Sequence, residues 1–597
     1  MARAHFVGAR LGTAAIARER QRRRRLRRLA TFLGIVAVFL WWRALTGRPL
    51  LPALPTLPSD AMFWLPGLLI IALLAAVIVI PMLANARSPH IEYRPEQIEV
   101  SFSDVRGMGE VLTEVQHTLQ VLLDYRKFRE EMGGQPRRGV LFEGPPGTGK
   151  THIAKAMAKE ADVPFLFVSS TAFQSMWYGM TARRIRAYFR KLRKAARTEG
   201  GAIGFIEEID AIATKRAGAG EAGTLDAFGS MDTGGIVNEL LIQMQSFDDP
   251  TTRERLAGWF KGWLNRYLAP EHQLRLRRPP YANILLVGAT NRASSLDTAL
   301  LRPGRFDRIL HFGLPTRSAR RELVDYFLDR KAHHSELDEE KLRDDLASMT
   351  LGSSPAALER LFDEALLLAL RGGRDALTMA DVRRARTEIE IGLPEATDYP
   401  EHERETIATH EAGHATVAYL VGKGRKLEML SIIKRRAALG FLAHRLQEER
   451  HTQKETELLA LIEIAMGGMV AEEIFFGESS TGPGGDLANA TGIAVEMVGS
   501  LGLGGSLISF RSLDGGPFGG NLAHQVLADR RARESVDQLL NDAKADVRRL
   551  LSGNRHVIEA LRDALLDRDE LVDEEIVEVI EKAGPTELGL SPELMSS

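Results

Sequence analysis

Two histidines and a glutamate have the types and spacing of a metal-dependent hydrolytic site. His410 and His414 are four residues apart, so on a helix they share one face and can bind the same ion. Glu411 lies beside them, where a carboxylate can take a proton from a metal-activated water. This H-E-x-x-H pattern is typical of Zn²⁺ sites, although it also arises by chance on solvated helices. The chain has no cysteine, so a third protein ligand must be another histidine or a carboxylate.

A second chemical motif is a phosphate-binding loop. Residues 136–143 predict a strand that leads into the loop, and residues 152–161 predict the helix that follows it. Backbone N–H groups of such a loop surround phosphates, and the helix N-terminus adds its dipole. We expect Lys150 to reach the β- and γ-phosphates of ATP and the Thr151 hydroxyl to bind Mg²⁺. The predicted nucleotide-binding residues are Gly144, Pro145, Pro146, Gly147, Thr148, Gly149, Lys150 and Thr151.

Two further apolar segments predict strands that end in polar residues. Ala202–Ile206 is followed by Glu207 and Glu208, and P-loop ATPases place acidic residues here to bind magnesium and to orient the attacking water. Asn283–Gly288 is followed by Asn291, a polar side chain placed to sense the γ-phosphate. These residues would complete an ATP-hydrolysing site.

Arg302 and Arg305 follow, three residues apart, in the segment 300–308. Combined with the preceding motifs, they resemble the AAA+ ATPases, whose paired arginines reach into the nucleotide of the neighbouring subunit. The resemblance implies that Arg302 and Arg305 act in trans within a homo-oligomeric ring, expected to be a hexamer. Surface ion pairing is the alternative interpretation of these arginines.

An aromatic segment precedes the second strand. Membrane proteases of this superfamily have an aromatic–hydrophobic–glycine loop here, which lines a central pore and pulls polypeptide. The matching residues are Trp177, Tyr178 and Gly179. Large rings grip a chain with little loss of rotamer entropy. Burial of both rings in a core is the alternative.

The charge distribution sets the N-terminus apart. The 597 residues carry 78 basic and 79 acidic side chains, so a net charge of −1 favours no nucleic-acid partner. Residues 1–28 hold ten arginines and one glutamate, and two apolar segments follow, Leu29–Trp42 and Ala61–Ala84. These segments predict two membrane-spanning helices, and the arginines place both the N-terminus and the body of the chain on the cytoplasmic side. A cleaved signal peptide is the alternative for the first segment.

The region after the histidines carries a more specific resemblance. Gly467–Glu473 and Ser480–Leu487 are similar to the third-ligand region of the FtsH-type membrane-anchored, ATP-dependent zinc metalloproteases, which puts Asp486 in the position of the third zinc ligand. The likeness implies one Zn²⁺ per subunit, ATP with Mg²⁺, polypeptide substrates, contact with membrane lipid and a bacterial cell membrane. It also implies ATP-driven unfolding and threading of membrane and cytoplasmic proteins into a proteolytic chamber, for protein quality control.

The expected fold is therefore multidomain: two transmembrane helices, an α/β P-loop AAA+ module with a helical lid, and a mostly α-helical zinc peptidase domain. An acidic, turn-rich linker at 391–403 marks the last boundary. The predicted domains are a basic cytoplasmic N-terminus (1–28), two transmembrane helices with a short extracytoplasmic loop (29–84), the nucleotide-binding subdomain (100–315), the helical lid (316–392) and the metallopeptidase domain (398–597).

Four features depart from the family, one of them an extracytoplasmic loop too short for a folded domain. Glu207 stands where an aspartate is usual, and its extra methylene moves the carboxylate by roughly 1.5 Å. Because Mg²⁺ demands near-ideal geometry, a membrane-tethered unfoldase or scaffold with weak ATP hydrolysis is the alternative function. Trp177 replaces the usual phenylalanine. An insertion, 248–281, holds Trp259, Trp263 and Tyr267 at helical spacing, which indicates either a helix that touches a partner or membrane, or core packing.

Overall fold

The chain forms two compact units, residues 1–323 with 352–357, and residues 324–351 with 358–597. The computed structural model describes residues 27, 30, 31, 33–47, 67, 69–74, 89–125, 127–174, 180–213, 227–248, 252–267, 274, 281–395, 399–435, 438–446, 450, 452–482, 484–505, 507–513 and 522–586.

The two predicted membrane spans are only partly described. Residues 33–45 are helical, and their apolar side chains, including Ile35, Val38 and Trp41, are exposed. Most of the second predicted span, Ala61–Ala84, lies outside the described residues. Within the described part of the chain, no helix is both long enough and apolar enough to cross a bilayer.

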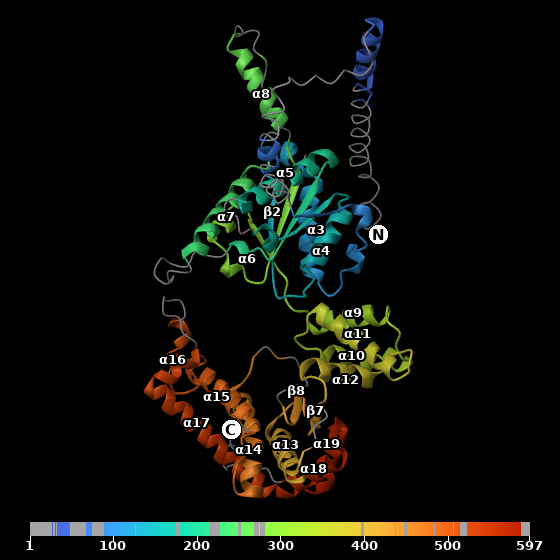
Figure 1. Cartoon of the computed structure of the whole chain (residues 1–597). Coiled ribbons are helices and arrows are strands. Elements are labelled where there is room, and N and C mark those ends of the chain that lie inside the picture. Colours follow the sequence, from blue (N-terminus) through green and yellow to red (C-terminus); the bar gives the residue numbers. More distant parts are fainter. Residues whose placement is uncertain are drawn as a thin grey trace. The chain divides into compact units, whose positions relative to one another are not determined.

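A six-stranded sheet forms the centre of the first unit (Figure 1). Its order is β1-β3-β4-β5-β2-β6, and all neighbouring strands are parallel except β1 and β3. The central strands are continuous apolar runs because both faces of the sheet are covered. The strands are β1 (Ile91–Tyr93), β2 (Gly139–Glu143), β3 (Phe165–Ser169), β4 (Ala202–Glu207), β5 (Ile284–Thr290) and β6 (Arg308–His311).

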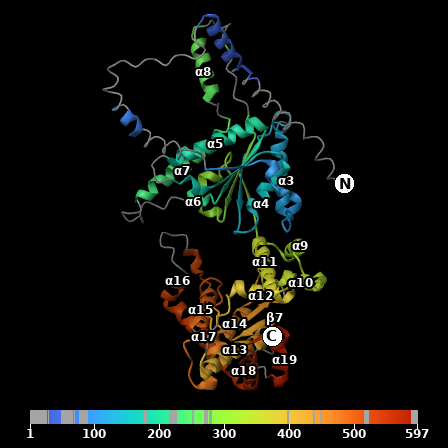
Figure 2. The same cartoon turned by 45° about the vertical axis from the view of Figure 1, so that its right-hand side comes forward.

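Helices cover the two faces of this sheet (Figure 2). Val140 and Phe142 of β2 pack in one core with helices α3 and α4, and Leu141 packs in the other with α5 and α7, because successive strand residues point to opposite faces. Because these strands are parallel, their carboxyl ends lie at the same edge of the sheet. The phosphate loop follows the carboxyl end of β2 and therefore lies at this edge. The helices of this unit are α3 (Gly109–Leu123), α4 (Lys150–Glu160), α5 (Met180–Glu199), α6 (Asp210–Ala213), α7 (Ala227–Gln245) and α8 (Thr252–Asn265).

Four helices follow the sheet, within the residues 316–392 that were predicted as the helical lid. Helix α12 begins at a capping box in which the Thr378 backbone N–H and hydroxyl donate to Asp381 at 2.9 and 2.7 Å. Arg374 also binds this carboxylate, and the pair lowers the pKa of Asp381 to about 2. The helices are α9 (Arg317–Leu328), α10 (Glu340–Met349), α11 (Pro355–Arg371) and α12 (Met379–Glu390).

The C-terminal part is mostly helical, with one small sheet of order β8-β7-β9. Helices α13 and α14 cross closely because glycines meet where they touch: a Cβ at Gly413 would lie 2.5 Å from the Gly467 carbonyl oxygen. The elements are α13 (Glu401–Val421), β7 (Arg425–Ser431), β8 (Phe441–Leu446), α14 (Glu455–Phe476), α15 (Gly484–Gly499), α16 (Leu522–Ala528), α17 (Arg530–Gly553), α18 (Arg555–Arg568), β9 (Glu570–Val572) and α19 (Glu574–Ala583).

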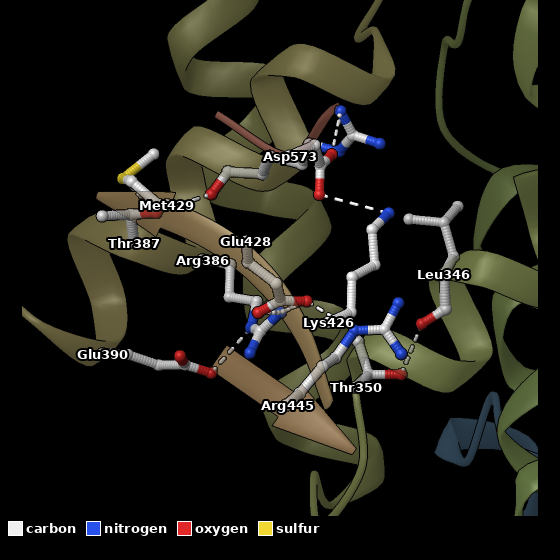
Figure 3. Close-up of polar contacts among 11 residues, drawn as sticks. Leu346, Thr350, Arg386, Thr387, Glu390, Lys426, Glu428, Met429, Arg445 and Asp573 are labelled. Carbon is white, nitrogen blue, oxygen red and sulfur yellow. Dashed lines mark hydrogen bonds and ion pairs between the residues drawn. The ribbon is translucent and has the colours of Figure 1, made fainter. Parts of the chain in front are cut away.

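Ion pairs join the last lid helix to this small sheet (Figure 3). Arg386 of α12 donates to Glu428 of β7 at 3.0 Å, and Arg445 of β8 binds the same carboxylate. Arg383 of α12 pairs with Asp573, just before α19, at 2.8 Å. Helix α12 is thus held on the peptidase sheet by several half-buried charges, where ion pairs are screened less than at an open surface.

Candidate metal centre and nucleotide site

Helix α13 carries the H-E-x-x-H residues on a buried turn. His410, Glu411 and His414 are 8%, 6% and 6% exposed. The small residues around them, among them Ala412 and Ala415, are fully buried against α14 and the small sheet. His410, Glu411 and His414 are thus ionisable side chains buried among apolar neighbours, and such side chains need partners.

Asp486, in the first turn of α15, meets both histidines. Its Oδ2 lies 3.2 Å from His410 Nε2 and 3.4 Å from His414 Nε2, and the two Nε2 atoms are 3.0 Å apart. Tetrahedral zinc ligands at about 2.0–2.2 Å from the ion lie about 3.3–3.5 Å from one another. Among the described residues, these three are the group of acidic and histidine side chains that could hold an ion. The donor set fits Zn²⁺ and leaves a fourth position open.

The other ring nitrogen of each histidine is fixed by α14. His410 Nδ1 donates to Glu472 Oε1 at 2.7 Å, and His414 Nδ1 donates to the Ile464 carbonyl at 2.7 Å. These bonds turn both Nε2 atoms toward Asp486 and make them available to a metal. The role of Glu472 was missed by sequence reasoning. The sequence carried no specific signal for it, because the burial of this carboxylate, which is 2% exposed, shows only in the folded structure.

The charges of the centre shape its pKa values. Burial raises the pKa of Glu411, and the two histidines oppose that rise. Burial alone would also raise the pKa of Asp486, but hydrogen bonds to His410 and His414 outweigh it and hold the pKa well below its ordinary value. Glu411 is the more readily protonated carboxylate of the two, as a proton acceptor in catalysis should be.

Two glycines leave the space that these side chains fill. A Cβ at Gly468 would lie 2.4 Å from the His410 ring, and a Cβ at Gly440 would lie 2.8 Å from Glu411 Oε1. A larger residue at either position would displace a side chain of the centre. Gly440 immediately precedes β8, so the start of this edge strand lies against Glu411.

The phosphate loop has the expected strand–loop–helix setting. It connects β2 to α4, whose first residue is Lys150. Gly149 has a φ of +87°, a left-handed conformation that favours glycine, and a Cβ at Gly144 would lie 2.1 Å from the Phe312 carbonyl oxygen. The predicted residues 144–151 are thus brought into one loop at a helix N-terminus, which suits a phosphate group.

Residues from three strands meet at this loop. The Thr151 hydroxyl donates to Glu207 Oε1 at 2.7 Å, and Lys150 Nζ donates to Asn291 Oδ1 at 3.3 Å. Burial lowers the pKa of Lys150 below its ordinary value, and the opposing charges of Asp210 and Glu207 offset this effect only in part. The structure therefore brings together the predicted magnesium ligand, the lysine and the γ-phosphate sensor.

The remaining predicted ATPase residues lie in two other places. Glu208 follows β4 with a φ of +51°, a strained backbone that is typical of functional positions. Arg302 is exposed, whereas Arg305 is half-buried and donates to the Ala299 carbonyl of its own chain. The predicted pore residues, Trp177–Gly179, lie outside the described residues.

Comparisons with known proteins match the nucleotide site and the metal centre to two separate families. Residues 140–314 match the ATPase family associated with various cellular activities (AAA), and residues 398–579 match Peptidase family M41. The chain is 34% identical over 477 residues to ATP-dependent zinc metalloprotease FtsH 3 of Sphaerobacter thermophilus, covering 80% of this chain and 86% of that relative.

Other relatives are longer than this chain. The FtsH protein of Mycoplasma mobile is 33% identical over 487 residues, which cover 80% of this chain and 62% of the relative. That of Protochlamydia amoebophila is 34% identical over 493 residues, which cover 81% and 49%. The AAA module and the zinc peptidase domain expected from the sequence are confirmed, and this chain belongs to the family of the FtsH-type ATP-dependent zinc metalloproteases.

Proposed function

We propose that this chain is the subunit of a membrane-anchored, hexameric protease that unfolds, threads and degrades membrane and cytoplasmic proteins. The observation that carries this proposal is the buried set of His410, His414 and Asp486, whose ligating atoms lie within 4.8 Å of one another. Its distances and donor types suit Zn²⁺, and it shares a chain with a complete phosphate loop. Protein quality control in a bacterial cell membrane is the role that we infer.

In the peptidase step, His410, His414 and Asp486 would hold Zn²⁺, which would supply a Lewis acid to polarise the peptide carbonyl and acidify water. Glu411 accepts the proton of the attacking water and passes it to the leaving amine. Burial raises the pKa of Glu411, which brings its basicity closer to that task. Glu472 positions His410 through its 2.7 Å hydrogen bond.

In the ATPase step, residues 144–151 would bind the phosphates, and Thr151 and Glu207 would hold Mg²⁺. Glu208 orients the attacking water, and Asn291 reports on the γ-phosphate through Lys150. Exposed Arg302, with Arg305, acts on the nucleotide of a neighbouring subunit. The Trp177–Tyr178–Gly179 loop then moves the substrate toward the peptidase.

The membrane anchor is proposed from the two apolar segments within 29–84. The exposed apolar side chains of the helix at 33–45 support it, because such side chains suit lipid better than water. We assign the domains as 1–28, 29–84, 100–315, 316–392 and 398–597. These bounds are supported by the lid helices ending at Glu390 and by α13 starting at Glu401.

The test is zinc content and peptidase activity of the purified full chain. We expect one zinc per chain, and we expect Asp486→Asn to lose both the zinc and the activity while retaining ATP hydrolysis. Glu496→Gln is the matched control, because Glu496 lies on the same helix and pairs with Arg511 at the surface. Full zinc content and activity in Asp486→Asn would overturn the assignment of the metal centre.

A further inference from the structure

The insertion between α7 and β5 forms a helix, α8, that neither site uses. Figures 1 and 2 show α8 packed on neither face of the sheet. Its apolar side chains recur at the three- and four-residue spacing of one helix face. They are exposed rather than buried in a core: Leu256 (65%), Trp259 (70%), Phe260 (56%), Trp263 (45%) and Tyr267 (74%), which follows just after the helix.

These aromatic rings contact one another along the helix. The ring centroids of Phe260 and Trp263 are 6.0 Å apart, and those of Trp263 and Tyr267 are 5.3 Å apart. The result is a continuous aromatic stripe, defined here as residues 256, 259, 260, 263 and 267. Contiguous apolar surface of this kind marks a place where another molecule binds, unlike a single exposed ring.

The insertion leaves the sheet at a fixed base. Arg138, just before β2, donates to Asp248 at 2.9 Å and to the Tyr281 hydroxyl at 3.2 Å, so it holds both ends of the insertion. The Tyr281 ring also stacks on Tyr125, with centroids 5.0 Å apart. Further out, Asn265 closes the segment through two hydrogen bonds with the backbone of Leu274. The ATPase core is therefore complete without α8.

The charge of the insertion indicates what covers the stripe. Residues 252–278 carry seven arginines and lysines but two glutamates. At 3.6 residues per turn, Arg266 lies at the border of the stripe, whereas Lys261 lies on the opposite side of the helix. A second copy of α8 would bring the same positive charge to the contact and be repelled. An anionic surface is attracted instead.

We propose that α8 is an interfacial helix that lies in the headgroup region of an anionic lipid bilayer. Tryptophan and tyrosine favour this depth because one end of each ring system is apolar and the other is polar. Lysine and arginine add attraction to acidic headgroups. This inference goes beyond the proposed function, since it assigns a role to a segment that takes part in neither ATP hydrolysis nor proteolysis.

The absence of cysteine makes a local test possible in the full chain. Leu256→Cys places an environment-sensitive dye on the stripe, and Glu359→Cys on exposed α11 is the control position. Each labelled chain is incorporated into vesicles of phosphatidylcholine alone or of phosphatidylcholine mixed with phosphatidylglycerol. With the acidic lipid, we expect the dye at 256 to emit at shorter wavelength and to be quenched by brominated lipid, whereas the dye at 359 does neither.

Substituting the rings separates this contact from anchoring by the N-terminal segments. Trp259→Ser with Trp263→Ser should reduce the quenching at 256 several-fold, while the chain stays with the vesicles and its ATP hydrolysis is unchanged. Leu370→Ser, at another exposed apolar residue, should change nothing. High salt should weaken the contact with acidic lipid.

Two results would overturn the inference. One is equal emission and quenching at position 256 in both kinds of vesicle. The other is a wavelength shift that rises with protein concentration in detergent without lipid, which would mean that a second copy covers the stripe. Failure of the chain to remain with any vesicle would instead contradict the proposed membrane anchor. Vesicle association is measured by flotation, independently of the dye.

Discussion

The Thr151 hydroxyl donates a hydrogen bond to Glu207 Oε1 at 2.7 Å, which links the phosphate loop to the end of β4. These are the two side chains that would share a magnesium ion. The longer glutamate therefore already reaches the threonine without distortion of β4, which continues to Glu207 in regular pairing with β3. We take this contact as an argument for a working ATPase and against the weakly hydrolysing alternative.

The first prediction concerns this carboxylate. Glu207→Gln should reduce ATP hydrolysis by about 10²-fold, because an uncharged amide binds Mg²⁺ less well than a carboxylate does. Glu207→Asp, which restores the usual residue, should stay within about tenfold of the unmodified chain, since it retains the charge. Steady-state phosphate release measures both. A large increase in the rate of ATP hydrolysis in Glu207→Asp would show that Glu207 limits hydrolysis in the unmodified chain.

The second prediction concerns the carboxylate behind the metal centre. Glu472→Gln should weaken zinc binding or proteolysis by about 10- to 100-fold, because it loses the charged partner of His410. Competition with a zinc chelator measures the affinity. Glu473→Gln is the control, since the neighbouring Glu473 instead pairs with Lys544 and Arg548. Equal effects of the two substitutions would contradict a positioning role for Glu472.

The third prediction concerns the crossing of α13 and α14. Gly413→Ala should lower the free energy of unfolding of the peptidase domain by about 1–3 kcal/mol, because its Cβ would strike the Gly467 carbonyl. Gly492→Ala in α15 has open space around its Cβ and should raise stability by about 0.5–1 kcal/mol. Thermal unfolding of the full chains, followed by calorimetry, distinguishes them. A neutral Gly413→Ala would mean that the helices separate easily.

The fourth prediction concerns pH. Burial, with a smaller contribution from the like charge of Asp546, raises the pKa of Glu463 on α14 to about 7 from 4.5. An acid with a raised pKa in the folded state binds more protons there than when unfolded, so stability falls as pH rises from 4.5 to 7.

Glu463→Gln mimics the protonated form and should remove this fall. The substitution should have little effect on the unfolding temperature near the lower end of this range and raise it above the upper end. The free-energy difference at high pH should be about 1–3 kcal/mol. Calorimetry on either side of the range checks it. An equal effect of Glu463→Gln at both ends would show that Glu463 does not titrate in this range.

The sequence predicted those parts of the site that are local in the chain. His410, Glu411 and His414 lie within one helical turn, and the phosphate loop is a single continuous segment, so spacing alone was enough. The strands around the loop were predicted from their apolar runs, and the structure pairs them in one sheet. Asp486 lies 76 residues from His410 and was placed only through the family resemblance.

Features that depend on packing were beyond the sequence. The partnership of Glu472 with His410 requires knowing how α14 crosses α13. The pattern of Trp259 and Trp263 fits a core helix as well as a surface helix, because periodicity gives one apolar face but not what covers it. Their exposure in the structure decides between these two interpretations.

Degradation of an unfolded protein by the full chain, with ATP and Zn²⁺, tests the central claim most directly. It would be compared in three forms: the unmodified chain, Glu411→Gln and Lys150→Ala. We predict ATP-dependent degradation by the unmodified chain, none by Glu411→Gln despite continued ATP hydrolysis, and neither activity in Lys150→Ala. Degradation by Glu411→Gln at the unmodified rate would contradict the account, because Glu411 is the proposed proton acceptor.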